Sequence, residues 1–174
     1  MTKKDLRPSE FAPYYLRYIE KLPDEIHLRD SFKLGKETVV SFFNGIPHDK
    51  HDYAYDLGKW TCKEVLQHLV DTERIFQYRL FRIARNDKTA LAGFDQSIYM
   101  EPSMAKSKSM DDLLAEFTAV RNSSIILLNS LGDDELEHIG IADGSKMSAR
   151  AAAFTIAGHD IWHMEIVMKK YLSC

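Results

Sequence analysis

The sequence predicts an all-α protein whose core is a four-helix bundle. Apolar residues recur at helical spacing in four long stretches, and strand-like alternation is weak throughout the chain. Only five prolines occur, and none of them lies inside those stretches. With 174 residues the chain can bury a sizeable core, so we expect a single domain over residues 1–174.

The first element expected is a short helix over residues 8–22, which Pro23 ends. This segment is aromatic. The sequence leaves open whether it packs on the bundle or lines the interface of a homodimer; its rings are Phe11, Tyr14, Tyr15 and Tyr18. The first bundle helix is expected over residues 30–43, because Asn44-Gly45 follows as a stop signal. Residues 46–59 hold a proline, a glycine and several charges, which predicts a loop.

The other three bundle helices are expected to begin at good N-capping residues. Thr61 and Glu64 fit the capping-box pattern, in which each side chain bonds the backbone N–H of the other residue, and this helix runs to about residue 86. The third helix is expected from Ser109 to about residue 131, where Gly132-Asp133 ends it. The last helix is expected from Ser148 to about residue 172.

The connection between the second and third bundle helices is long, from residue 87 to about residue 109. Short loops make neighbouring helices antiparallel, whereas a crossover of this length allows the next helix to run parallel to the last. The expected topology is therefore up-down-down-up.

The composition excludes several classes of function. Lys+Arg total 23 against 26 for Asp+Glu, so the net charge of −3 gives no electrostatic footprint for nucleic acid or for an anionic membrane. No apolar run is long enough to span a bilayer. The two cysteines, Cys62 and Cys174, form no CxxC motif, and the N-terminus lacks the apolar core of a signal peptide. We therefore expect a cytoplasmic protein.

Three histidines are the candidate functional residues. His159 and His163 are four residues apart in the last helix, so their imidazoles project from one face, and His68 lies in the second bundle helix. If the two helices pack together, the three imidazoles converge as ligands for zinc, nickel or iron. The alternative is a hydrogen-bonded core network without metal. A metalloprotease HExxH motif is excluded, because Asp160 follows the first histidine of the pair.

The sequence also resembles the DinB/YfiT-like superfamily. The stretch at residues 60–73, WTCKEVLQHLVDTE, is similar to its signature, which opens on Trp-Thr or Trp-Ser and has a histidine eight residues after the tryptophan. Gly93-Phe94-Asp95 in the crossover, Arg121 in the third helix and the final His159-x-x-x-His163 follow in the same order. The resemblance covers the chain from about residue 30 to its end.

The resemblance implies an up-down-down-up bundle with a divalent ion, most often nickel or zinc, on histidines that match His68, His159 and His163. Members of this superfamily include thiol S-transferases, which move a low-molecular-weight thiol to an electrophile, and proteins described as metal-dependent hydrolases. We expect thiol transfer to a small-molecule substrate. The alternatives are a metal-dependent hydrolase and a non-enzymatic protein in which the histidine-bound metal is structural.

Three further side chains are candidates for supporting the site. Asp71 and Asp160 each lie three residues from a histidine, so each could accept the N–H of a ligand imidazole. Arg121 could bind a carboxylate of the substrate, although an ordinary salt bridge is the simpler interpretation. Cys62 lies near a helix N-terminus but about a turn and a half from His68, and we do not expect it to be catalytic.

Overall fold

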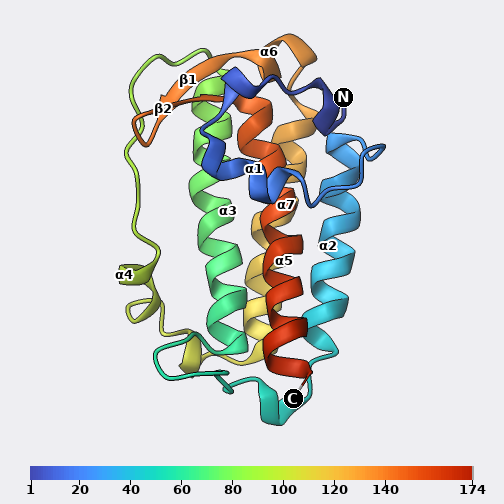
Figure 1. Ribbon diagram of the computed structural model, residues 1–174, viewed down its shortest axis with the longest axis vertical. Coiled ribbons are helices and arrows are strands. Elements are labelled where there is room, and N and C mark those ends of the chain that lie inside the picture. Colours follow the sequence, from blue (N-terminus) through green and yellow to red (C-terminus); the bar gives the residue numbers. More distant parts are fainter. Residues whose placement is uncertain (174) are drawn as a thin grey trace.

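The computed structural model describes residues 1–173 and contains the predicted four-helix bundle (Figure 1). Its long helices are α2 (Leu28–Asn44), α3 (Cys62–Ala84), α5 (Met110–Asn129) and α7 (Ala149–Val167), the last continued by a π-helical turn, η6 (Met168–Leu172).

The helices run in the expected up-down-down-up order. In Figure 1 the molecule is drawn with α2 and α7 running downward and with α3 and α5 running upward, which is the same order with the vertical direction reversed. Helices α3 and α5 are therefore parallel. The crossover between them descends along the outside of the bundle and contains the short helix α4 (Ser97–Met100) and the 3-10 turn η5 (Ala105–Ser107). Each of α3 and α2 packs against both α5 and α7. The loop between α2 and α3 contains one 3-10 turn, η4 (His48–Lys50).

The predicted helix boundaries agree closely with the structure where a capping residue marks them. Glu64 N–H donates to Thr61 Oγ1 at 3.2 Å and Thr61 N–H donates to Glu64 Oε2 at 2.8 Å, which completes the expected capping box of α3. Ser109 and Ser148 accept hydrogen bonds from Asp112 N–H and Ala151 N–H, each at 3.0 Å. These bonds satisfy backbone donors that the first turn of a helix leaves free.

The prediction of a single helix over residues 8–22 is wrong. The N-terminal segment forms three 3-10 turns, η1 (Lys3–Asp5), η2 (Pro8–Glu10) and η3 (Pro13–Tyr15), and one short helix, α1 (Leu16–Ile19). Pro13 explains the break, because a residue that precedes proline is pushed out of the helical region, and Ala12 is extended with φ −67° and ψ 141°. The segment packs on the bundle, with α1 against α7.

A β-hairpin was missed. After the short helix α6 (Asp133–Glu137), strands β1 (Ile139–Ala142) and β2 (Ser145–Ser148) pair in antiparallel register, with Ala142 opposite Ser145. Asp143 and Gly144 form the two-residue turn, both at positive φ, 53° and 71°. An Asp-Gly pair between apolar residues is the standard sequence signal for such a turn. The hairpin caps one end of the bundle (Figure 1).

A layer of buried charge divides the core. One hydrophobic cluster fills the half of the bundle nearest the hairpin and another fills the opposite half. Between their positions on α3, α5 and α7 lie Glu73, Arg121 and Asp160, each at most 2% exposed. Arg121 donates to Glu73 at 2.8 Å and to Asp160 at 2.6 Å. Gly35 on α2 faces this layer and leaves room for the Arg121 guanidinium, because a Cβ at this position would lie only 3.0 Å from Arg121 Nη1.

A second buried ion pair ties the N-terminal segment to the bundle. The Glu10 carboxylate is fully buried and accepts from Arg150 Nη2 at 2.6 Å and from Ser148 Oγ at 2.8 Å. Further along, the chain passes so close to α7 that a Cβ at Gly158 would lie 2.0 Å from the carbonyl oxygen of Tyr18. The segment is therefore fixed over α7 at two points. Among residues 1–173, no helix has the length and apolar character that crossing a bilayer requires.

Candidate metal centre

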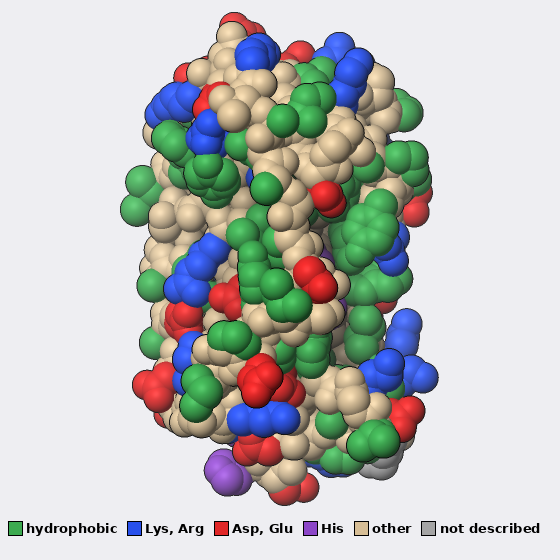
Figure 2. All heavy atoms as spheres, turned by 90° about the vertical axis from the view of Figure 1, so that its left-hand side faces the viewer, with side chains coloured by type: hydrophobic (Ala, Val, Ile, Leu, Met, Phe, Trp, Pro, Cys, Tyr) green, Lys and Arg blue, Asp and Glu red, His purple; other side chains and the backbone are tan. Residues whose placement is uncertain are grey.

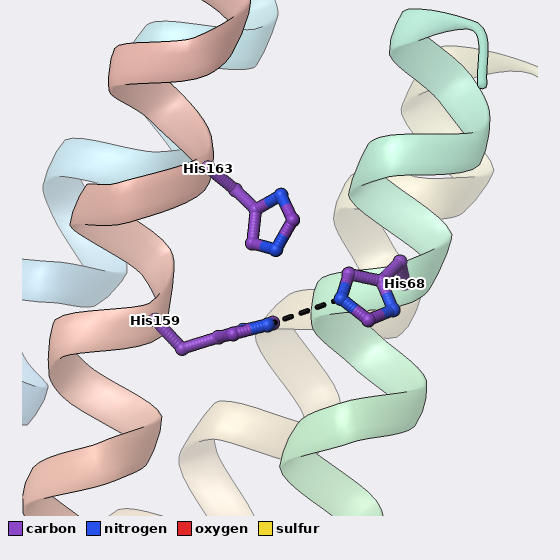
Figure 3. Close-up of side chains that lie close together, drawn as sticks. All are labelled: His68, His159 and His163. Carbon is purple, nitrogen blue, oxygen red and sulfur yellow. Dashed lines mark hydrogen bonds between the residues drawn. The ribbon is translucent and has the colours of Figure 1, made fainter. Parts of the chain in front are cut away.

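The structure brings the three predicted histidines together (Figure 3). His159 and His163 project from α7, His68 projects from α3, and the rings point toward one another. One nitrogen from each ring can be chosen so that all three lie within 4.8 Å of one another. His68 Nε2 and His159 Nε2 are 3.0 Å apart.

The packing of α3 against α7 produces this convergence. The i, i+4 spacing places His159 and His163 one above the other on the face of α7 that meets α3. Two aromatic rings pack against the imidazoles. Tyr18 lies edge-on to His159 with ring centroids 5.1 Å apart, and the ring centroids of Trp60 and His68 are 4.7 Å apart. Thr72, one turn after His68, has its hydroxyl 3.4 Å from His68 Nδ1.

Burial keeps the three imidazoles neutral at neutral pH. It lowers the pKa of His68 to about 3, with a further contribution from the nearby His163, and lowers the pKa of His163 to about 4. Burial also lowers the pKa of His159 well below its usual range, and His163 and His68 add to this effect. Neutral imidazole is the form that binds a metal ion, so protons do not compete for the site near pH 7.

The histidines lie at the wall of a cavity of about 440 Å³. The N-terminal segment, α3, the crossover and α7 all contribute to its lining. Aromatic side chains are the largest group in that lining; they are Tyr14, Tyr15, Tyr18, Trp60, Phe76, Phe94 and Trp162. Thr72, Gln96, Asp143, Ser145 and Thr155 supply its polar groups. Figure 2 shows a hollow on the face that carries the crossover, with histidine visible inside it and hydrophobic side chains around it.

Two aspartates do not make the hydrogen bonds expected of them. Asp71 accepts from Gln67 Nε2 at 3.0 Å and faces Arg74, so its carboxylate turns away from His68. Asp160 points into the charged layer, where it accepts from Arg121. Burial raises the pKa of Asp160 to about 6, although the Arg121 guanidinium opposes that shift. The i, i+3 spacing placed each aspartate near a histidine without fixing the direction of its side chain.

The suggestion that Arg121 binds substrate is wrong, because its side chain is 0% exposed and bonds to Glu73 and Asp160. It forms the salt bridge that was the simpler interpretation. Cys62 is also fully buried, and burial raises the pKa of its thiol to about 11. This position agrees with the expectation that Cys62 is not catalytic.

Several residues of the cavity are not predicted by the sequence. The hairpin contributes Ala142, Asp143 and Ser145, whose signal in the sequence was the Asp-Gly turn. The N-terminal segment contributes Tyr14, Tyr15 and Tyr18, and the sequence does not decide between packing on the bundle and a dimer interface for them. The contact of Tyr18 with His159 depends on the close approach at Gly158, which no local pattern indicates.

The histidine cluster fits a divalent ion. Two imidazole nitrogens bound to one tetrahedral zinc ion at about 2.05 Å lie about 3.3 Å apart, close to the 3.0 Å between His68 and His159. The most widely spaced donors need to approach by about 1–2 Å to match such a geometry. Without an ion, one of the two facing nitrogens can donate a hydrogen bond to the other, and within residues 1–173 His163 meets the other two imidazoles only through ring contacts.

Fold and site together define a four-helix-bundle protein with three converging histidines beside an aromatic cavity. The sequence model of the DinB superfamily matches residues 31–167. The chain therefore belongs to the DinB superfamily. No curated protein sequence is significantly similar to it.

Two solved structures share the fold. YfiT from Bacillus subtilis is described as a probable metal-dependent hydrolase with an unusual four-helix bundle topology. Its sequence is 16% identical to this chain, and the two structures align with a TM-score of 0.67 over 95% of this chain and 91% of YfiT. A mycothiol-dependent maleylpyruvate isomerase is 11% identical, with a TM-score of 0.66 over 98% of this chain. This chain spans 63% of the isomerase.

Proposed function

We propose that this protein is a metal-dependent enzyme in which His68, His159 and His163 hold a divalent ion, nickel or zinc, and a low-molecular-weight thiol is transferred to an electrophilic small molecule. The observation that carries this proposal is the convergence of three neutral imidazoles at the wall of a cavity of about 440 Å³. That volume suits a small ligand.

The number of ligands favours a catalytic ion over a structural one. Structural zinc sites are closed by four protein ligands, whereas catalytic sites have three and keep a position for water or substrate. No carboxylate or thiol of residues 1–173 joins the three histidines. The open side of the cluster faces the cavity, so a small molecule has room there.

The surrounding residues supply the conditions for nucleophilic chemistry. A divalent ion on these histidines would lower the pKa of a bound thiol or water. Tyr18 and Trp60 pack on the imidazoles and restrict bulk water, which strengthens electrostatic interactions at the site. The Thr72 hydroxyl next to His68 Nδ1 helps to fix the orientation of that ring.

Thiol transfer is placed ahead of hydrolysis on two grounds. Seven aromatic side chains line the cavity, which suits a site that protects a thiolate from water. A protein with the same fold is described as mycothiol-dependent, which supports the thiol as a co-substrate. Metal-dependent hydrolysis is the second candidate, since YfiT is described as a probable hydrolase of that kind. We also propose that the protein is cytoplasmic, forms a homodimer and has no nucleic-acid partner.

An activity assay tests this proposal. The nickel- and zinc-loaded protein is incubated with a panel of low-molecular-weight thiols and a generic electrophile, and with an ester panel without thiol. We expect thiol consumption that His68→Ala abolishes and that His48→Ala, an exposed histidine outside the site, leaves unchanged. Ester cleavage without thiol would favour hydrolysis, and equal activity in His68→Ala would contradict both reactions.

A further inference from the structure

Arg79 continues the line of cavity residues that begins at His68. On α3, His68, Thr72 and Phe76 all line the cavity. Arg79 is eleven residues after His68, a spacing that returns to within about 20° of the same helix face about 16 Å further along the axis. Its guanidinium packs against Tyr15, Phe76 and Phe94, which themselves line the cavity.

The Arg79 guanidinium is buried but poorly satisfied. The side chain is 1% exposed; Nη1 donates to the Tyr15 hydroxyl at 3.4 Å and Nη2 to the Ala92 carbonyl oxygen at 3.2 Å, and Nε has no hydrogen-bond partner. The guanidinium carbon lies 4.8 Å from the ring centroid of Phe76 and 5.6 Å from that of Phe94. Both neutral acceptors are at long distances, so the charge is only weakly compensated.

The other deeply buried arginines show what is missing at Arg79. Arg121, 0% exposed, bonds to the carboxylates of Glu73 and Asp160, and Arg150, 3% exposed, bonds to those of Glu10 and Glu137. No carboxylate of residues 1–173 lies within ion-pair distance of Arg79. Burying an unpaired charge is costly, so an unmatched guanidinium in a wall is a position for an external anion.

A second cavity gives that anion room. It has a volume of about 350 Å³ and is lined by Arg79, by aromatic rings and by the start of the crossover, including exposed Thr89 and Ala92. Phe94 lines both cavities, and Tyr15, which accepts from Arg79, lines the larger one. Arg82 also lines the second cavity, but Asp87 already pairs with it. Arg79 is therefore the arginine of this cavity with an unmatched charge.

We propose that Arg79 and the cavity beside it form a binding site for a carboxylate. A guanidinium presents parallel N–H donors that match a carboxylate, and Phe94 and Tyr99 provide apolar walls for the carbon skeleton of the ligand. Because about three helical turns of α3 separate Arg79 from His68, the ligand is an elongated molecule whose carboxylate is remote from its reacting group. Its role as substrate rests on the proposed function, whereas the anion site itself does not.

The test uses benzoate as the probe and benzamide as its uncharged counterpart. Binding to the metal-free protein of residues 1–174 is followed by NMR titration. We expect saturable benzoate binding and no comparable binding of benzamide. Arg79→Met should weaken benzoate binding about tenfold or more, because it removes a charge-assisted hydrogen bond. Arg85→Met, at the residue that follows the last residue of α3, is the control; Arg85 is half-exposed and paired with Glu135, so this variant should bind benzoate like the wild type.

Two further measurements separate this site from the alternatives. His68→Ala should bind benzoate normally, so a failed metal site leaves the anion site testable. Arg79→Met should be at least as resistant to denaturant as the wild type, because an apolar side chain replaces a poorly paired charge. If Arg79→Met does not fold, Arg79→Gln takes its place in the benzoate titration. Unchanged benzoate binding in the Arg79 variant, equal binding of benzamide, or no benzoate binding by the wild type would each overturn the proposal.

Discussion

Removing the Glu10 carboxylate should destabilise the protein far more than removing a second carboxylate on the same arginine. Arg150 donates from Nε and Nη2 to Glu10, which is fully buried, and from Nη1 to Glu137, whose side chain is 49% exposed. Hydrogen bonds from Arg150, Ser148 and Arg7 overcome the effect of burial and lower the pKa of Glu10 to about 2. The ionised carboxylate is therefore the partner on which the buried guanidinium depends.

The magnitude follows from the two environments. The Arg150 side chain is only 4% exposed in the wild type, and in Glu10→Ala it keeps only its bond to Glu137. Breaking a buried pair in this way costs about 3–5 kcal/mol. In Glu137→Ala the lost partner is half-exposed and screened by water, so the cost is about 1 kcal/mol or less. A loss of 3–5 kcal/mol is a large part of the stability of a typical domain.

Urea unfolding followed by circular dichroism measures both variants, and hydrogen exchange reports where the loss occurs. We expect the midpoint of Glu10→Ala to fall well below that of Glu137→Ala, with the largest loss of protection at the N-terminal segment. That segment lines the cavity with Tyr14, Tyr15 and Tyr18, so its release would also open the candidate site. Equal destabilisation by the two substitutions would refute the argument from burial.

Three further predictions concern other parts of the chain. Gly158→Ala should destabilise the protein by about 1–3 kcal/mol despite the better helix propensity of alanine, because its Cβ would overlap the Tyr18 carbonyl oxygen. In Gly132→Ala the nearest atom is 3.6 Å from the new Cβ, so only the weaker N-capping of α6 by alanine remains, and the cost should be about 1 kcal/mol or less. Folding lowers the pKa of Glu10 from 4.5 to about 2, so the stabilisation from its ionised carboxylate is complete above pH 4.5 and is lost as the pH falls through 2. The difference in unfolding free energy between wild type and Glu10→Gln should therefore shrink between pH 4.5 and 2, and a constant difference would count against the ion pair. In a Cys174→Ser variant, Cys62 should resist iodoacetamide at pH 8 until the protein unfolds, since burial raises its pKa to about 11; rapid labelling of the native protein would contradict this.

The features that local chemistry determines could be predicted from the sequence. Thr61, Ser109 and Ser148 cap helices through bonds to residues three positions away, so the pattern and the outcome lie in the same few residues. The long crossover similarly predicts a parallel pair of helices from its length alone. The histidines converge because i, i+4 spacing fixes two of them and the packing of α3 against α7 supplies the third.

Features that depend on distant parts of the chain could not be predicted in the same way. The partners of Arg121 are 48 and 39 residues away on other helices, so its burial is decided by how the bundle packs. The direction of Asp71 and Asp160 follows from Gln67 and Arg121, which compete with the histidines as partners. The hairpin is a different case, because Asp143-Gly144 signalled it and its four-residue strands were too short for the alternation pattern to stand out.

Metal binding by the purified protein tests the central claim most directly. The metal-free chain is titrated with nickel and with zinc, and elemental analysis after gel filtration gives the ions retained per chain. We predict one ion per chain, and loss of that ion in His159→Ala and His163→Ala while the helical circular dichroism spectrum is kept, with His48→Ala unaffected. No retained ion in the wild type, or full retention in both α7 variants, would contradict the assignment of the three histidines as a metal site.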